Sequence, residues 1–397
     1  MIQIKRDNLD TLAERHYIEY FEGKGFLEKL KEIENSEKDR AQRRFFQYIL
    51  TNIKDIITGA PETLSKIREE LYYNHKAILK KIEYYEKLKR KKKKAEKDFK
   101  KSQESLDKLV ENRATQAVQG TARDNMQKKH QVLKRIEYYV HESTQLLMKI
   151  NKVFNYTDFC TIGNNWGAYE LVKELNIDVC PYCNRQFISI AEPTKGEKGR
   201  TRPQLDHFYS KSKYPFLSIS FFNLIPCCYV CNSNLKRNYD FTRETHLHPY
   251  EAGFENLIQF TIEFEKNKGK LDYVKAWYSN PELFSIGLKL NPIKKNQYTR
   301  DELKVLLRKV NNNKRVFKLK SLYNSHRDYV GEILVKSMMY NDSKIDALQH
   351  EFPRLFPTKE SVVRLLHSNY IDSSDWDKRV LSKLTYDVTQ EFGIHNA

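Results

Sequence analysis

The sequence predicts an α+β protein that is mainly helical, with a small cysteine-containing module near its middle and a long helical hairpin before that module. Apolar residues recur at helical spacing over residues 10–30 and 40–57, and residues 299–392 also have a helical pattern, with basic stretches at 304–320. Residues 62–112 contain neither proline nor glycine, which favours a long helix. In residues 178–240, by contrast, glycine, proline, cysteine and aromatic residues occur together with short strand-like segments. We therefore expect helical regions on both sides of a central region that contains short strands and turns.

The composition is that of a globular protein with an excess of positive charge. The 397 residues are enough for two or three domains. Lysine and arginine number 70 against 52 aspartate and glutamate residues, which gives a net charge of +18. Such an excess favours a polyanionic partner, with nucleic acid as the first candidate and an anionic membrane surface as the second.

The sequence also carries an expectation about location. Its first residues, MIQIKRDNLD, contain no apolar segment typical of a signal peptide, and no run of about 18 apolar residues offers a transmembrane helix. We expect a cytoplasmic protein that does not enter a membrane. In a reducing cytosol, closely spaced cysteines indicate metal binding rather than disulfides.

Four segments are expected along the chain. They are an N-terminal helical segment at 1–60, an antiparallel, coiled-coil-like arm at 61–155, the cysteine module at 156–255, and a small accessory sheet plus a C-terminal helical region at 256–397. The first segment should end at the break Thr58-Gly59-Ala60-Pro61. The accessory sheet is expected between Ile258 and Leu290, where apolar and polar residues alternate.

The arm shows a weak seven-residue repeat, which Lys92 interrupts. The apolar members of the repeat are Leu71, Ile78, Tyr85, Phe99 and Leu106. We expect one helix of about 50 residues from Glu62 to Asn112, a hairpin tip at 116–121 and a return helix from Asn125 to Phe154. The basic run 89–94 is either a phosphate-contacting patch or a solvated helix face.

Two C-x-x-C pairs carry the strongest chemical signal in the chain. They are Cys180-Pro-Tyr-Cys183 and Cys228-Tyr-Val-Cys231. Tetrahedral zinc takes four soft ligands, and each such turn presents two thiolates to one ion, so the four cysteines predict a structural zinc site. The two-residue gap to Cys231 favours Cys228 over Cys227 as a ligand. Cys160 and Cys227 are then expected to be small buried side chains.

Further polar residues lie between and after these cysteines, in a recognisable order. C-x-x-C, Asp206-His207, Asn223 and then C-x-x-C-Asn232 resemble the motif of zinc-containing HNH endonucleases, whose fold is called ββα-metal. The final histidine of the family name is Asn232 here. Lys236 follows Asn232 by four residues, whereas many members have a lysine at the third position. The resemblance covers residues 180–236 only.

The resemblance implies a β-hairpin followed by a helix, with a role for each motif residue. His207 is implied as the general base that activates a water molecule, since imidazole titrates near neutral pH. Asp206 and the side-chain oxygen of Asn232 are implied as ligands of a catalytic Mg²⁺ or Mn²⁺ ion, and Asn223 as the support of the intervening loop. Zinc would pin the hairpin to the helix. Asn234 is the alternative to Asn232 if the helix register shifts.

Basic residues around the motif are predicted to contact nucleic acid. The loop 192–204 contains glycines and several cations, which predicts a basic hairpin end that either contacts phosphates or is merely solvated. The predicted contacts are Lys195, Lys198, Arg200, Arg202, Lys211, Lys213 and Lys236. His246 and His248 are expected to pack or to contact phosphate, rather than to bind a second metal ion.

The predicted function is metal-dependent hydrolysis of phosphodiester bonds in DNA. A closer resemblance, carried by MIQIKR, CPYC, LDHFYSKSKYP and CCYVCNSNLK, is to the HNH effectors of Septu-type and retron-associated anti-phage systems. It implies a role in prokaryotic antiviral defence and an ATPase partner protein. Two alternatives stay open: an HNH-like toxin that cuts RNA or tRNA, and a zinc-stabilised nucleic-acid-binding scaffold without catalysis.

Overall fold

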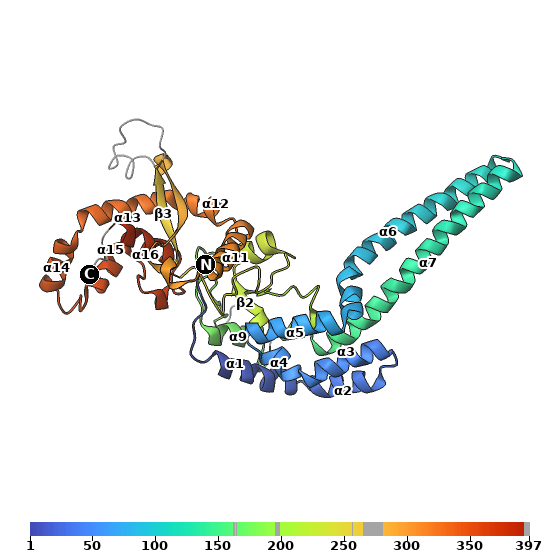
Figure 1. The fold of residues 1–397 in the computed structure, drawn as a ribbon, viewed down its shortest axis with the longest axis horizontal. Coiled ribbons are helices and arrows are strands. Elements are labelled where there is room, and N and C mark those ends of the chain that lie inside the picture. Colours follow the sequence, from blue (N-terminus) through green and yellow to red (C-terminus); the bar gives the residue numbers. More distant parts are fainter. Residues whose placement is uncertain (162, 164, 195–198, 256, 265–280, 393–397) are drawn as a thin grey trace. The chain divides into compact units, whose positions relative to one another are not determined.

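The computed structural model of the chain describes residues 1–161, 163, 165–194, 199–255, 257–264 and 281–392 (Figure 1). The chain divides into two compact units, each built from separate stretches of sequence. The first unit contains residues 1–16, 160–208 and 221–397, and the second contains residues 17–159 and 209–220. Helix predominates, and the strands form small antiparallel pairs, which agrees with the expected α+β class.

The N-terminal region is helical, as predicted. Its elements are α1 (Leu9–Arg15), η1 (His16–Glu22), α2 (Phe26–Ser36), α3 (Arg40–Thr51), α4 (Ile53–Thr58) and α5 (Pro61–Asn74). The break between α4 and α5 falls at the predicted Gly59-Ala60, and Pro61 occupies the first turn of α5, where its missing N–H is not needed. Residues 17–60 belong to the same unit as the arm.

The predicted antiparallel hairpin consists of α6 (Lys76–Glu111) and α7 (Gln116–Val153), which lie side by side in Figure 1. Contacts across the hairpin are Tyr85 with Thr144 (Oη to Oγ1, 3.2 Å), Lys92 with Glu137 (Nζ to Oε1, 3.4 Å) and Phe99 with His130 (ring centroids, 4.8 Å). These contacts recur every seven residues on both helices. The heptad position therefore faces α7, and Lys92 interrupts its apolar character with an ion pair.

Two details of the arm differ from the prediction. The expected single helix from Glu62 is divided at His75, so α5 is a separate helix from the hairpin. The turn lies at residues 112–115, with Arg113 in the left-handed conformation at φ 53°, and Gly120 lies inside α7. A lone glycine weakens a helix by only about 1 kcal/mol, so it does not by itself end one.

The cysteine module contains a short β-hairpin followed by a helix, all in the first unit. Strand β1 (Gln204–His207) pairs antiparallel with β2 (Leu224–Cys227), with His207 opposite Leu224. Helix η4 (Val230–Lys236) follows β2. The other elements of residues 156–223 are α8 (Tyr156–Phe159), α9 (Ala168–Leu175), η2 (Pro215–Leu217) and η3 (Phe221–Asn223).

The predicted accessory sheet is confirmed: β3 (Ile258–Phe264) pairs antiparallel with β4 (Phe284–Leu290). Residues 299–392 are largely helical, also as predicted. Elements after β3 are η5 (Pro281–Leu283), η6 (Lys294–Gln297), α11 (Arg300–Val316), α12 (Leu319–Tyr323), η7 (Asn324–His326), α13 (Arg327–Met339), α14 (Asp342–Glu351), α15 (Lys359–His367), η8 (Ser373–Asp375) and α16 (Ser382–Glu391).

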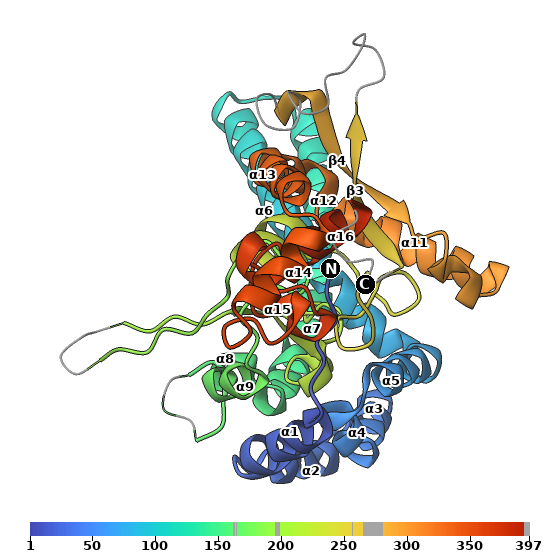
Figure 2. The ribbon, with the colours of Figure 1, turned by 90° about the vertical axis from the view of Figure 1, so that its left-hand side faces the viewer.

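Helix α16 lies beside β3 (Figure 2), and the buried Asp387 carboxylate accepts a hydrogen bond from the Phe260 amide at 2.8 Å. Asp387 also pairs with the fully buried ammonium group of Lys383 on the same helix.

None of the helices in the described part of the chain is long and apolar enough to cross a membrane.

Candidate metal centre and active site

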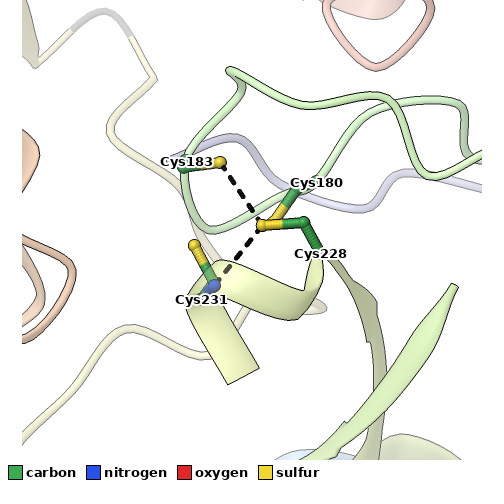
Figure 3. Close-up of side chains that lie close together, drawn as sticks. All are labelled: Cys180, Cys183, Cys228 and Cys231. Atoms are coloured by element: carbon green, nitrogen blue, oxygen red, sulfur yellow. Dashed lines mark hydrogen bonds between the residues drawn. The ribbon is translucent and has the colours of Figure 1, made fainter. Parts of the chain in front are cut away.

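The four predicted cysteine ligands come together in the first unit. Cys180, Cys183, Cys228 and Cys231 are all buried, and their sulfur atoms lie within 4.8 Å of one another (Figure 3). Cys228 rather than Cys227 belongs to the cluster, as the spacing predicts. Cys227 is buried on β2 and Cys160 is half-buried, both outside the cluster.

The first cysteine pair is presented by a tight turn. Val179 and Phe187 form a short antiparallel bridge, and inside it the Asn184 amide donates to the Cys180 carbonyl at 2.7 Å. Asn184 takes the left-handed conformation at φ 51°, which asparagine adopts more readily than most residues. The turn therefore points Cys180 and Cys183 in the same direction.

The second pair stands at the start of η4. The Asn232 amide donates to the Cys228 carbonyl at 3.1 Å, and the Cys231 amide donates to the Cys228 sulfur at 3.4 Å. An amide directed at a sulfur favours its thiolate form. Hairpin strand β2 and the first turn of η4 thus place Cys228 and Cys231 opposite the turn that carries Cys180 and Cys183.

The arrangement of the sulfurs fits a tetrahedral metal ion. Four thiolates at about 2.3 Å from zinc would be about 3.8 Å apart, and the Cys183 and Cys228 sulfurs are 4.0 Å apart. Hydrogen bonds from Cys180, Cys183 and Cys231 lower the pKa of Cys228, whereas burial raises the pKa of Cys180. Several thiolates cannot be buried together without a compensating cation. The four cysteines could therefore bind a metal ion such as zinc.

Distant parts of the first unit hold the Cys180–Asn184 turn in place. The Asn184 side-chain oxygen accepts a hydrogen bond from the Lys383 amide at 3.1 Å, and its carbonyl accepts one from the Leu381 amide at 2.6 Å. The Cys183 carbonyl accepts a hydrogen bond from the Tyr323 hydroxyl at 2.6 Å. The start of α16 and the end of α12 are therefore bonded to the same turn that carries two of the sulfurs.

Asp206, the predicted ligand of a catalytic cation, has both carboxylate oxygens engaged inside the protein. Tyr182 donates to one oxygen at 2.6 Å, and Lys236 donates to the other at 2.9 Å. Asp206 is 2% exposed and Lys236 is 1% exposed. Burial, followed by the charge of Asp206, raises the pKa of Tyr182, so its hydroxyl stays protonated and donates. A hydrated cation reaches this carboxylate only if Lys236 or Tyr182 moves.

Lys236 is therefore an internal partner of Asp206 and not, in this structure, the surface contact for nucleic acid that the sequence suggested. Its ammonium group also donates to the His207 carbonyl at 2.6 Å and lies 4.8 Å from the centre of the Phe241 ring. Helix η4 is a π-helix, with a wide turn in which the Arg237 amide donates to the Asn232 carbonyl. Such a turn accommodates one extra residue, which suits the four-residue spacing from Asn232 to Lys236.

The remaining motif residues surround the hairpin. His207 ends β1 and is 9% exposed, while Asn223 is fully buried and its carbonyl accepts a hydrogen bond from the Phe208 amide at 3.0 Å. Asn232 is half-buried, and its side-chain amide donates to Gln204 at 2.9 Å. Successive residues of a strand project to opposite faces, so Gln204 and Asp206 face η4 and His207 leaves β1 on the other side. Asn234, the alternative to Asn232, is exposed.

The predicted basic contacts divide between the two units. Lys195 and Lys198 lie outside the described residues. Arg200 is exposed, whereas Arg202 is half-buried and donates to the Cys160 sulfur at 3.1 Å. Lys211 and Lys213 belong to the second unit, where Lys213 pairs with Glu83 at 3.5 Å and Lys211 lies 4.9 Å from the centre of the Tyr156 ring.

The two histidines after the motif have packing roles, as expected. His246 stacks on Phe241 with ring centroids 3.7 Å apart, and His248 is buried against Phe208 at 4.1 Å. Burial lowers the pKa of His246 to about 4 and that of His248 to about 3. Both rings are therefore neutral near pH 7.

Two residues of this site escaped the sequence analysis. Tyr182 lies between the first two cysteines, and Gln204 precedes Asp206 by two residues on the same strand face. Gln204 accepts hydrogen bonds from Asn232 and from Ser233, each at 2.9 Å. The two-residue period of the strand could have suggested that Gln204 shares a face with Asp206.

Together these residues form a β-hairpin and a helix joined through four buried cysteines. Asp206 and Asn232 lie on the side of the hairpin that faces η4, and His207 ends β1 on its other side. No protein-family model, no curated protein and no solved structure matches the chain.

Proposed function

We propose that the chain is a metal-dependent endonuclease of the HNH type that hydrolyses phosphodiester bonds in DNA. The observation that carries the proposal is the order of elements: a strand ending in Asp206-His207, a returning strand after Asn223, and a helix bearing Asn232. The buried cysteine cluster joins that helix to the rest of the unit. This order of a hairpin and a helix supports the ββα arrangement that the sequence resemblance implies.

The proposed chemistry assigns each residue a task. His207 takes a proton from the attacking water, and zinc at the four cysteines keeps the hairpin and η4 together. Asp206 and Asn232 would hold Mg²⁺ or Mn²⁺, a hard cation that supplies positive charge to the phosphate as negative charge develops on it. For Asp206 to do so, the hydrogen bond from Lys236 or the one from Tyr182 must rearrange.

A second function is favoured by that same arrangement. Asp206 is buried and both of its carboxylate oxygens accept hydrogen bonds. If the Lys236 ammonium group always stays bound to Asp206, no catalytic cation can bind there. The chain would then be a non-catalytic, zinc-stabilised scaffold that binds nucleic acid. In that case Asp206 and Lys236 are structural, and the +18 net charge serves binding alone.

The deciding experiment compares cleavage by wild-type protein with that by His207→Ala. Plasmid, linear duplex, single-stranded DNA and tRNA are each incubated with protein in Mg²⁺ or Mn²⁺, with and without EDTA. We expect divalent-cation-dependent cutting of DNA, reduced at least about 100-fold in His207→Ala, a typical general-base contribution. His350→Ala, an exposed histidine on α14, is the matched control and should cut normally.

Other outcomes separate the alternatives. Cutting of tRNA alone would replace the DNA substrate with RNA. A folded, zinc-loaded protein that binds DNA but cuts none of the four substrates would support the scaffold. Near wild-type cutting by His207→Ala would remove the proposed base.

The sequence resemblance also suggests an ATPase partner and a role in antiviral defence, and we propose the α6–α7 hairpin as the docking element. Its apolar seam is thin, because Lys92 occupies a heptad position. The contacts from Tyr85 and Lys92 to α7 define a register in which Lys87 lies opposite Glu142. Deleting residues 87–142 and joining the ends with a short Gly/Ser linker therefore shortens the hairpin without leaving either helix unpaired.

If the hairpin docks a partner, the shortened protein keeps its metal but no longer co-purifies with an ATPase encoded beside it. Intact co-purification would contradict the docking role, and so would collapse of the cysteine module. The alternative is a purely structural role, in which the hairpin only covers the apolar core of its own unit.

A further inference from the structure

Helix α11 carries a row of exposed cations on one side. Arg300, Lys304, Arg308 and Arg315, here called the basic stripe, are all exposed. At 3.6 residues per turn their side chains leave the helix within an arc of about 80° and along about 22 Å. Asn311 projects within the same arc.

The basic stripe is not neutralised by acidic residues. Within the described part of the chain none of its four side chains forms an ion pair, and Arg308 donates only to the Glu244 carbonyl, at 3.1 Å. This differs from the arm, where Lys92 is paired with two glutamates. Donors that are exposed, aligned and without anionic partners remain available to a ligand.

The surface along the stripe is hollowed into two neighbouring grooves that share Asn311. One is lined by Arg300, Lys304 and Arg308 together with Leu303 and Leu307. The other is lined by Arg315, Lys314, Lys318 and Lys320, of which Lys320 is paired with Glu263 at 3.0 Å. Burial is the main cause that lowers the pKa of Lys314, and the charge of Lys320 lowers it further.

The stripe belongs to a helix that is firmly anchored on its other side. Thr299 and Glu302 form a capping box at its first turn, and the Asn313 side chain accepts a hydrogen bond from the Leu247 amide at 3.0 Å. At its end, Phe317 stacks on Tyr182 with ring centroids 4.4 Å apart, and Tyr182 donates to Asp206. The stripe and the candidate site are thus connected through side chains in contact within one unit.

We propose that the basic stripe of α11 is a binding surface for the phosphate backbone of duplex DNA. A duplex carries one negative charge per about 1.7 Å of its axis, so a stripe of this length faces many phosphates. A helix that binds a membrane surface needs a continuous exposed apolar face. On α11 only Val305 is an exposed apolar side chain, whereas Leu303, Leu306 and Leu307 are half-buried and Val310 is buried. The proposal concerns binding and stands whether or not the chain cuts DNA.

The test measures binding of full-length protein to a labelled duplex of random sequence, in EDTA, as a function of salt concentration. The stripe variant carries Arg300→Gln, Lys304→Gln, Arg308→Gln and Arg315→Gln. Its log–log salt slope should fall by roughly 3 to 4, and its affinity at moderate salt should drop at least about 100-fold. Circular dichroism should be unchanged, because all four side chains are exposed.

Two matched variants make the result specific. The first removes four other exposed cations of the same unit, by Lys295→Gln, Lys344→Gln, Arg354→Gln and Arg364→Gln, and should change the slope by less than about 1. The second replaces the stripe arginines by lysine, which keeps the charge and should keep binding. Equal losses in the two glutamine variants would overturn the proposal, because net charge alone would then explain binding.

Two further outcomes also count against it. An unchanged slope in the stripe variant would show that α11 does not touch the backbone. Binding to vesicles of phosphatidylserine and phosphatidylcholine but not to the duplex would assign the stripe to a lipid surface. Since cleavage is not measured here, a failure of His207 as catalytic base leaves this result unaffected, and a failure of the stripe leaves the cleavage test unaffected.

Discussion

The four-cysteine centre and the α6–α7 hairpin obtain their stability in opposite ways. In the centre, a few buried polar atoms make contacts between residues far apart in sequence, as in the hydrogen bonds of Asn184 with α16. In the hairpin, many weak contacts repeat along two helices, and ion pairs such as Lys92–Glu137 are partly exposed. Removing one contacting side chain should therefore lower the free energy of unfolding strongly in the centre and only slightly in the hairpin.

The largest expected effect is loss of one cysteine ligand. Structural zinc sites contribute on the order of 10 kcal/mol of apparent binding free energy, so Cys183→Ser should lose the metal and unfold the cysteine module. Hydrogen exchange should also lose protection in α16, because its first turn is bonded to the Cys180–Asn184 turn. Elemental analysis and exchange measure the two effects.

Cys160→Ser is the matched control for this variant, because Cys160 lies outside the cluster. It should keep about one metal ion per chain. A soluble, folded Cys183→Ser protein without metal would mean that the centre does not depend on the ion, and the contrast with the hairpin would disappear.

The next effect concerns the buried pair of Asp206 and Lys236. Lys236→Met leaves a buried carboxylate without its partner and should lower the free energy of unfolding by about 3–5 kcal/mol. Adding Asp206→Asn should restore part of that loss, which urea unfolding of the single and double variants measures as a coupling energy.

The exposed pair of Lys5 and Glu255 is the control for that cycle. Lys5→Met should cost less than about 1 kcal/mol, because solvent screens an exposed pair. If the buried and the exposed pairs gave the same loss, burial would not be what distinguishes the centre.

A smaller, pH-dependent effect is expected from His248. Burial lowers its pKa to about 3 in the folded protein, against about 6.5 when unfolded, so the unfolded state binds the proton first. Above pH 6.5 His248 is neutral in both states and does not lower the free energy of unfolding. As the pH falls from 6.5 toward 3, protonation of His248 in the unfolded state lowers that free energy. Between pH 6.5 and 5 the loss is about 2 kcal/mol.

His248→Phe removes the titrating group from its site beside Phe208. Unfolding of this variant should depend less steeply on pH than that of the wild type over the same range, and the difference between the two isolates His248 from any metal release. Identical slopes would show that the buried ring does not titrate as described.

The smallest effect is expected in the hairpin. Lys92→Leu completes the apolar heptad position and should stabilise the α6–α7 amides against exchange by about 1 kcal/mol or less. Lys93→Leu, at a neighbouring exposed position, should change exchange by no more than about 0.5 kcal/mol. A large loss in either variant would contradict the view that the hairpin spreads its stability over many contacts.

The sequence predicted those parts of the fold whose patterns are local. The heptad of the arm, the alternation in β3 and β4, and the spacing of the four cysteines each lie within one or two short segments. The division of the arm at His75 was missed, because nothing in the residues around it is a strong helix breaker.

The surroundings of the candidate site depend on distant contacts and were not foreseen. Lysine usually lies at a protein surface, so the sequence suggested that Lys236 contacts nucleic acid. Its burial follows from Asp206, 30 residues earlier, and from the ring of Phe241. The basic stretch at 304–320 was visible in a predicted helix, but the sequence does not show which of its cations are exposed on one side of α11.

The bonds between Asn184 and α16 also bear on how the protein is made. The side-chain oxygen of Asn184 accepts hydrogen bonds from Ser382 and Lys383, which are 198 and 199 residues later in the chain. A ribosome adds about 5–20 residues per second, so the cysteine turn leaves the ribosome roughly ten seconds or more before these two residues do. Both cysteine pairs are complete at residue 231, long before Ser382 and Lys383 are made. We therefore expect the nascent chain to bind its metal ion before α16 can bond to the cysteine turn.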